Sequence, residues 1–117
     1  MASLKQLMLG WQINKQLLEV GMKNIMRELV DRMFNEKEDF HTYLDMFHET
    51  HDHKEKAIFL KLAEAEGDHY KMLYDIIFEK EPATSLEFGL HKHAKEDYDK
   101  MLKCIKAAHE EMNAATK

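Results

Sequence analysis

The amino-acid sequence predicts an all-α protein, an antiparallel helical bundle of three long or four shorter helices. The chain contains only four Gly and one Pro, the residues that most often interrupt regular structure. Valine occurs only at positions 20 and 30, whereas the helix formers Leu, Met, Lys, Glu and Ala dominate. Apolar residues recur every three or four positions along most of the chain, which is the spacing of one helix face.

Composition limits the class of protein. The 117 residues suit a single domain, 1–117, with a modest core. A net charge of −5 with acidic and basic residues interspersed disfavours nucleic-acid binding. The single cysteine, Cys104, excludes an internal disulfide. The N-terminus lacks the apolar run of a signal peptide and no 18-residue apolar stretch occurs, so we expect a cytoplasmic protein without membrane contact.

The first helical region extends from Leu4 to Phe47, and its division is open. Gly21 disfavours a helix interior and marks one point for a break. Asn35, with Glu38 three residues later, forms a capping-box pattern and marks another. The third alternative is one continuous helix. The sequence does not choose among the three.

The later boundaries are better defined. Asp52 followed by Glu55 predicts the start of a second helical region, and the residue before Pro82 predicts its end. Thr84 followed by Glu87 predicts the start of the last helix. These boundaries leave short connections, as expected for a bundle.

Two Glu-x-x-His pairs are candidates for metal chemistry, Glu38 with His41 and Glu66 with His69. Helical bundles bind two metal ions with a Glu from each of two helices and a Glu-x-x-His pair from each of two others. Chance alone yields about one such spacing at this composition. The position of each pair on its helix must therefore distinguish them.

Helical periodicity places only one pair on an apolar face. At about 100° per residue, Leu62 and Leu73 lie within about 40° of Glu66, and His69 lies about 60° away. An ionisable group inside an apolar stripe is costly unless it is paired or bound to metal. Glu66 and His69 are therefore predicted metal ligands.

On the preceding helix the inward carboxylate is a different one. Phe40, Tyr43 and Phe47 fall within about 40° of Glu36, whereas Glu38 and His41 lie about 200° and 140° away. We expect Glu36 to point inward and the Glu38/His41 pair to be solvated.

These residues resemble a known pattern. Members of the ferritin-like or rubrerythrin-like superfamily carry a Glu followed seven residues later by Tyr, and about thirty residues on a run of the form F-x-x-L-A-x-x-E-x-x-H-x-x-x-L. The corresponding residues here are Glu36, Tyr43, Phe59, Leu62, Ala63, Glu66, His69 and Leu73. The spacing is most similar to the short encapsulated-ferritin type. The resemblance covers about 40 residues.

The resemblance implies a function. It implies a di-iron protein, with manganese or zinc as alternative metals, that oxidises iron or handles oxygen or peroxide as a ferroxidase-type oxidoreductase. Glu66 would bridge the metals, while Glu36 and His69 would be further ligands. Tyr43 and Tyr70 would orient them by hydrogen bonding. The implied assembly is a homodimer or higher homo-oligomer, because the encapsulated type completes its site across a dimer.

The sequence departs from the family where a self-sufficient chain needs a second inward Glu-x-x-His pair, which is missing. The site is therefore completed by a second subunit, uses other ligands, or has been lost. The alternative function is a non-enzymatic helical oligomer or interaction module that docks through the Leu4–Leu29 stripe. Glu36, Glu66 and His69 would then form a metal-free hydrogen-bonded network.

The remaining histidines and the cysteine are expected to be structural. We expect solvated histidines at 48, 51 and 53 and surface histidines at 91 and 93. His109 is expected at the edge of the core. Cys104 is expected to be a small buried residue.

Overall fold

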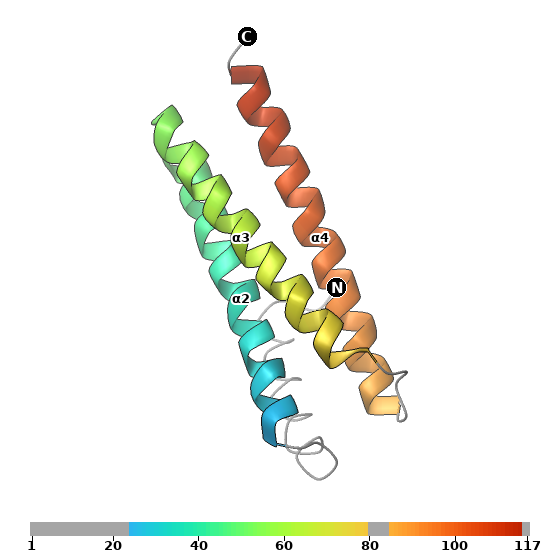
Figure 1. The fold of residues 1–117 in the computed structure, drawn as a ribbon. Helices are drawn as coiled ribbons and strands as arrows, with labels where there is room; N and C mark the ends of the chain where they lie inside the picture. The colour runs from blue at the N-terminus through green and yellow to red at the C-terminus, as the bar shows by residue number, and fades with distance from the viewer. Residues whose placement is uncertain (1–23, 80–84, 116–117) are drawn as a thin grey trace.

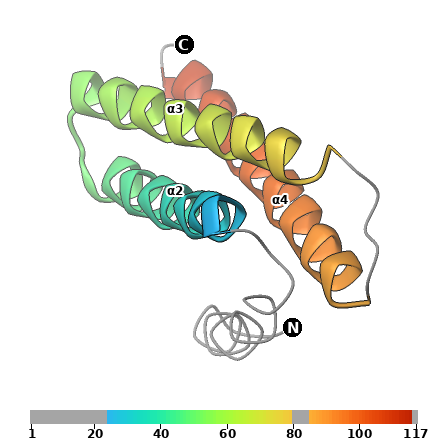
Figure 2. The ribbon, with the colours of Figure 1, turned by 60° about the horizontal axis from the view of Figure 1, so that its bottom comes forward.

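The computed structural model describes residues 24–79 and 85–115 and contains three helices in that part of the chain (Figure 1). They are α2 (Asn24–Glu49), α3 (His53–Ile77) and α4 (Ser85–Ala115). α2 and α3 form an antiparallel hairpin, and α4 returns along α3 (Figures 1 and 2). The all-α prediction is confirmed for these residues. The Leu4–Met22 part of the predicted stripe, Gly21, Pro82 and Thr84 lie outside the described residues.

α2 continues through Asn35 without a break. Asn35 is exposed, so its polar side chain remains hydrated while the backbone keeps its helical bonds. Met33 and Phe40 on either side of it are buried at 2% and 0% exposure. A break at Asn35 would separate these two core residues, and the predicted alternative of a boundary there is wrong.

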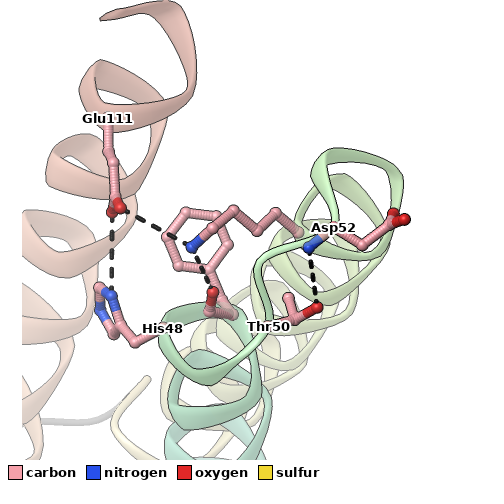
Figure 3. Close-up of polar contacts among 6 residues, drawn as sticks. His48, Thr50, Asp52 and Glu111 are labelled. Carbon is pink, nitrogen blue, oxygen red and sulfur yellow. Dashed lines mark hydrogen bonds and ion pairs between the residues drawn. The ribbon is translucent and has the colours of Figure 1, made fainter. Parts of the chain in front are cut away.

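The turn between α2 and α3 is capped as predicted, with one difference. Asp52 precedes α3, and its Oδ1 accepts a hydrogen bond from the Glu55 amide at 2.9 Å. The Glu55 carboxylate does not return the bond to the Asp52 amide. It accepts from Thr50 Oγ1 at 2.6 Å. Thr50 Oγ1 in turn accepts from the Asp52 amide at 3.2 Å (Figure 3). The Thr50 hydroxyl therefore connects the Asp52 amide to the Glu55 carboxylate, which replaces the direct bond of a capping box.

α3 ends at Ile77, slightly before the predicted boundary. The Phe78 amide donates to the Tyr74 carbonyl at 2.9 Å and closes the last turn. None of the described helices is both long enough and apolar enough to cross a membrane.

The core lies between the three helices. α2 and α3 make the more extensive contact, and α4 packs on α3 through small or flexible side chains seven residues apart, Ala94, Met101 and Ala108. Gly67 of α3 lies at this contact, because a Cβ built there would lie 3.4 Å from Ile105 Cδ1. The fully packed side chains include Val30, Met33, Phe40, Phe47, Ala63, Tyr70, Met101 and Ala108.

Candidate metal centre

The α2–α3 hairpin brings together the three residues that the sequence predicted as metal ligands. Glu36 lies at the middle of α2, and Glu66 and His69 lie one turn apart at the middle of α3. One ligand atom from each residue lies within 4.8 Å of the others. Among the described His, Cys, Asp and Glu side chains, this is the one group of three with such proximity. The antiparallel hairpin aligns the two helix centres, so the convergence follows from topology.

The distances within the group are too long for good hydrogen bonds. His69 Nδ1 lies 3.5 Å from Glu36 Oε2 and 3.9 Å from Glu66 Oε2. Hydrogen bonds from nitrogen to oxygen are normally 2.7–3.2 Å long. The predicted alternative, a metal-free network in which these three residues satisfy each other, is therefore poorly supported by this geometry.

Burial makes the Glu66 carboxylate the most demanding member of the group. Its side chain is 15% exposed, compared with 26% for Glu36 and 54% for His69. Glu66 Oε2 is buried and has no hydrogen-bond partner in the described structure. An unsatisfied buried oxygen costs free energy, the more so when it belongs to a charged group. A cation or a hydrogen-bond donor would therefore stabilise this oxygen, and the described residues place no hydrogen-bond donor there.

The donor set fits a transition-metal ion. Two donors that share an ion at about 2.1 Å lie about 3.0–3.4 Å apart, so small side-chain rotations would bring these three atoms into coordination. Two carboxylates and an imidazole suit iron, manganese or zinc. A cation would also offset the repulsion between the two carboxylates. Three ligands leave coordination positions open for a further ligand.

His69 lies nearer the surface than the helical angles predicted. Its side chain is 54% exposed, and Leu62 on the same side of α3 is 37% exposed. The apolar stripe of α3 is thus wider than the area that α2 and α4 cover. Glu66 lies on the buried side of that stripe, and His69 lies on its exposed side.

The two tyrosines predicted to support the ligands differ in their surroundings. Tyr43 is half-buried and packs against the core, seven residues after Glu36 on the same face of α2. Tyr70 is buried, and its hydroxyl donates to the Ala94 carbonyl of α4 at 3.1 Å while its ring stacks on Tyr98. The structure therefore gives the Tyr70 hydroxyl a partner other than the predicted ligands.

A buried ion pair beside the site was missed by sequence reasoning. Lys37 Nζ donates to Asp97 Oδ2 at 2.9 Å, and both side chains are largely buried. The pair joins α2 to α4 on the side of α2 that lies next to Glu36. In the sequence, a lysine directly after the inward Glu36 gave no sign of burial.

The Glu38/His41 pair is less solvated than predicted. Both residues are half-buried. Burial, followed by the charge of Lys37, lowers the pKa of His41 below its ordinary 6.5, although Asp45 and Asp97 act in the opposite direction. The pair does not converge with Glu36, so it is not part of the candidate centre.

The other histidines divide into exposed and structural residues. His48, His51, His53 and His93 are exposed, as predicted. His91 was predicted to be a surface residue, but it is half-buried, lies 2.5 Å from the Tyr74 hydroxyl and stacks on Phe78. His109 was predicted at the core edge, but it is exposed and contacts Glu64 of α3. Cys104 is half-buried against the core.

A separate polar junction joins the ends of all three helices near the α2–α3 turn (Figure 3). Lys56 Nζ donates to the Phe47 carbonyl at 2.7 Å and lies 4.4 Å from the Phe47 ring centroid. Glu111 of α4 lies 3.7 Å from Lys56 and 3.8 Å from His48. The lysine satisfies an end carbonyl of α2, where a positive charge is favourable. The junction is accounted for as a structural contact.

Comparison with known proteins does not add a family. No family model, curated protein or solved structure matches the chain.

Proposed function

We propose that the chain is a ferritin-like metal-binding protein that holds two iron ions and oxidises them with oxygen or peroxide. The main support is Glu66 Oε2, a buried carboxylate oxygen that has no hydrogen-bond partner in the described structure and lies 3.9 Å from His69 Nδ1. A bound cation satisfies this oxygen and neutralises both carboxylates.

The number of ligands supports a site shared between two subunits. A dinuclear bundle site takes four Glu and two His in total. Each chain contributes two Glu and one His from the described residues, so two copies contribute four Glu and two His. In this arrangement Glu36, Glu66 and His69 of each chain would together hold the ions. The protein is then a homodimer, or a larger oligomer of dimers, with a four-helix bundle around the metals.

Iron bound there would supply the electrons that reduce the oxidant: one hydrogen peroxide and two protons would take up one electron from each of two ferrous ions and give two waters and two ferric ions. The chain's own contribution is to hold the ions with carboxylates that favour the higher charge of the ferric state. The open positions beside the three ligands admit the oxidant. Zinc in the same ligands would leave the protein without this reaction, because zinc has no redox chemistry.

Metal content tests the proposal directly. Protein purified without chelator or affinity metal is expected to hold about one iron per chain after anaerobic ferrous loading, measured by elemental analysis. Glu36→Ala and Glu66→Ala should each abolish stoichiometric binding while helix content is unchanged. Glu38→Ala is the matched control, since Glu38 lies on α2 two residues from Glu36 and outside the group. Full iron content in Glu66→Ala would refute the proposal.

Exposed apolar side chains favour a second candidate, a non-enzymatic oligomer or interaction module. Ile25 is 65% exposed and Phe88 is 64% exposed, on different helices. The predicted docking stripe, Leu4–Leu29, lies mostly outside the described residues. Removal of residues 1–20 tests it: an unchanged mass in solution and unchanged solubility would contradict the module.

A further inference from the structure

α3 carries an exposed apolar stripe with the spacing of a coiled-coil seam. Its positions alternate by four and three residues, and all are exposed except Ala65, which is half-buried. α2 and α4 pack on two sides of α3 and leave this third side uncovered by the described helices (Figures 1 and 2). The stripe consists of Ile58, Leu62, Ala65, His69, Met72 and Ile76, and we call it the α3 seam.

The α3 seam is symmetric about position 67. Ile58 and Ile76 lie nine residues on either side of it, Leu62 and Met72 five, and Ala65 and His69 two. When two copies of α3 pack antiparallel, each position of the α3 seam therefore meets its mirror position in the partner. Ile58 packs on Ile76, and Leu62 packs on Met72. Such self-complementarity is the property of an isologous two-fold interface.

The charges flanking the α3 seam are complementary in the same register. Three exposed charged residues line one side of the α3 seam: Lys61, Asp68 and Asp75. In an antiparallel pair, Lys61 of one copy lies beside Asp75 of the other, and the pair occurs twice. Flanking charges of this kind set the orientation of paired helices. Asp75 contacts Lys71 within its own chain, and this exposed pair can exchange partners at little cost.

The centre of the register coincides with the candidate metal centre. Position 67 lies between Glu66 and His69, so both ligands lie next to the two-fold axis in each copy. Asp68 and Glu66 are not seam positions but flank the seam on opposite sides. On one side Asp68 lies beside Asp68 of the other copy, and on the other side Glu66 lies beside Glu66. Like charges in contact oppose pairing, and a divalent cation reverses this effect. Apolar contacts thus lie at the ends of the interface, and a cation-dependent layer lies at its middle.

We propose that a second copy of this chain docks on the α3 seam, with the two α3 helices antiparallel about a two-fold axis at position 67. The inference deepens the proposed function, on which its link to metal rests, by naming the surface and register that bring the second set of ligands. Ile58 to Ile76 spans about 27 Å of helix. The face of α2 next to it continues the surface with Ile25, which is 65% exposed and lies within about 20° of Glu36 on the helix.

The mass in solution tests the surface. Wild-type protein is expected to be dimeric by light scattering or sedimentation when Mn²⁺ is added, and chelator should weaken the dimer. Leu62→Glu combined with Met72→Glu should raise the dimer Kd at least about 100-fold, because the two substitutions place charges opposite each other twice. Leu102→Glu is the matched control: Leu102 is 45% exposed on α4, away from the seam. A monomeric wild type under both conditions, or a double variant that keeps the wild-type mass, overturns the inference.

Disulfide cross-linking tests the register with milder substitutions. In a background in which Cys104 is replaced by Ala, Leu62→Cys protein is mixed with Met72→Cys protein and oxidised. Antiparallel pairing predicts cross-links between the two variants and few within either one. A parallel pair predicts the reverse, with Leu62→Cys linking to itself, and this result overturns the inference.

A charge exchange tests the complementarity. Lys61→Glu should weaken the dimer about 5- to 20-fold by replacing two attractive pairs with two repulsive ones. Adding Asp75→Lys should restore most of the affinity, whereas a dimer insensitive to Lys61→Glu contradicts the register. Failure of the proposed function looks different: the protein dimerises through the α3 seam and binds no metal. Bound metal in a protein whose seam variants keep the wild-type mass refutes only the present inference.

Discussion

Glu66 carries a buried carboxylate oxygen whose unfavourable burial the proposed metal ion would offset. Its buried Oε2 has no hydrogen-bond partner in the described structure, so the metal-free protein carries a carboxylate oxygen that is desolvated without compensation. Glu66→Gln removes the charge with little change of shape, and its amide can donate to Glu36. We expect the metal-free unfolding free energy to rise by about 1–3 kcal/mol while metal binding is lost. Urea denaturation with chelator, paired with elemental analysis, measures both, and a destabilised Gln variant would show that the carboxylate is satisfied without metal.

The Lys37–Asp97 pair shows the opposite balance, because each charge depends on the other. Lys37→Met should lower the unfolding free energy by about 3–5 kcal/mol, since it leaves the Asp97 carboxylate buried without its lysine. Adding Asp97→Leu should recover most of the loss, because two apolar side chains replace the pair. Chemical denaturation of the two variants measures the difference. Equal stability of the single and double variants would mean that solvent reaches Asp97.

His41 is expected to make stability depend on pH. Its pKa is lowered in the folded protein by burial and by Lys37, so the unfolded chain takes up the proton first as the pH falls. The unfolding free energy should therefore decrease from pH 7 downward through 6.5, until the folded histidine also titrates. His41→Asn should flatten this part of the profile, and His93→Asn, an exposed control on α4, should not. Urea titrations at several pH values provide the test, and parallel profiles of wild type and His41→Asn would contradict it.

At the scale of helices, substitution of two glycines distinguishes the effect of helix propensity from the effect of contact between helices. Gly89 has no atom within 4 Å of a built Cβ, whereas at Gly67 Ile105 Cδ1 lies at 3.4 Å, an ordinary contact distance. Gly89→Ala and Gly67→Ala should each stabilise the protein by about 0.5–1 kcal/mol. Thermal or chemical denaturation measures both. A destabilising Gly67→Ala beside a stabilising Gly89→Ala would show that α3 and α4 approach too closely for a methyl group.

The continuity of α2 through Asn35 also depends on packing between helices. Asn35 and Glu38 have the spacing of a capping box, but local polarity did not outweigh the burial of Met33 and Phe40 in one continuous stripe. At the Asp52 turn, by contrast, the local pattern and the packing agree, and the cap forms as predicted.

At the scale of the whole molecule, metal binding and assembly are linked to stability. A ligand at 100 times its Kd stabilises the folded state by about 2.7 kcal/mol, or about 10 °C in Tm for a chain of this length. Mn²⁺ should therefore raise the Tm of the wild type by about this amount and leave Glu66→Ala unchanged. For a dimer, the Tm should also rise with protein concentration. Scanning calorimetry at two concentrations measures both effects, and a Tm independent of Mn²⁺ would count against the metal centre.

The sequence by itself determined the helices and the candidate ligands, because both depend on periodicity along one chain. The spacing of apolar residues identified α3 and the buried side of α2, and the same angles selected Glu36, Glu66 and His69. It did not indicate the burial of Lys37 or the Tyr74 contact of His91, since helix α4 creates both.

Only the tertiary structure decided which residues meet and which surface is left uncovered. Helical angles treat the whole apolar stripe of α3 as interior, yet α2 and α4 cover only part of it. Their packing leaves Glu66 buried and His69 exposed on the same stripe. The physical reason is that periodicity specifies the direction of a side chain about its own helix, whereas burial depends on where the other helices lie. The tertiary arrangement therefore decided both the isolation of Glu66 Oε2 and the exposure of the α3 seam.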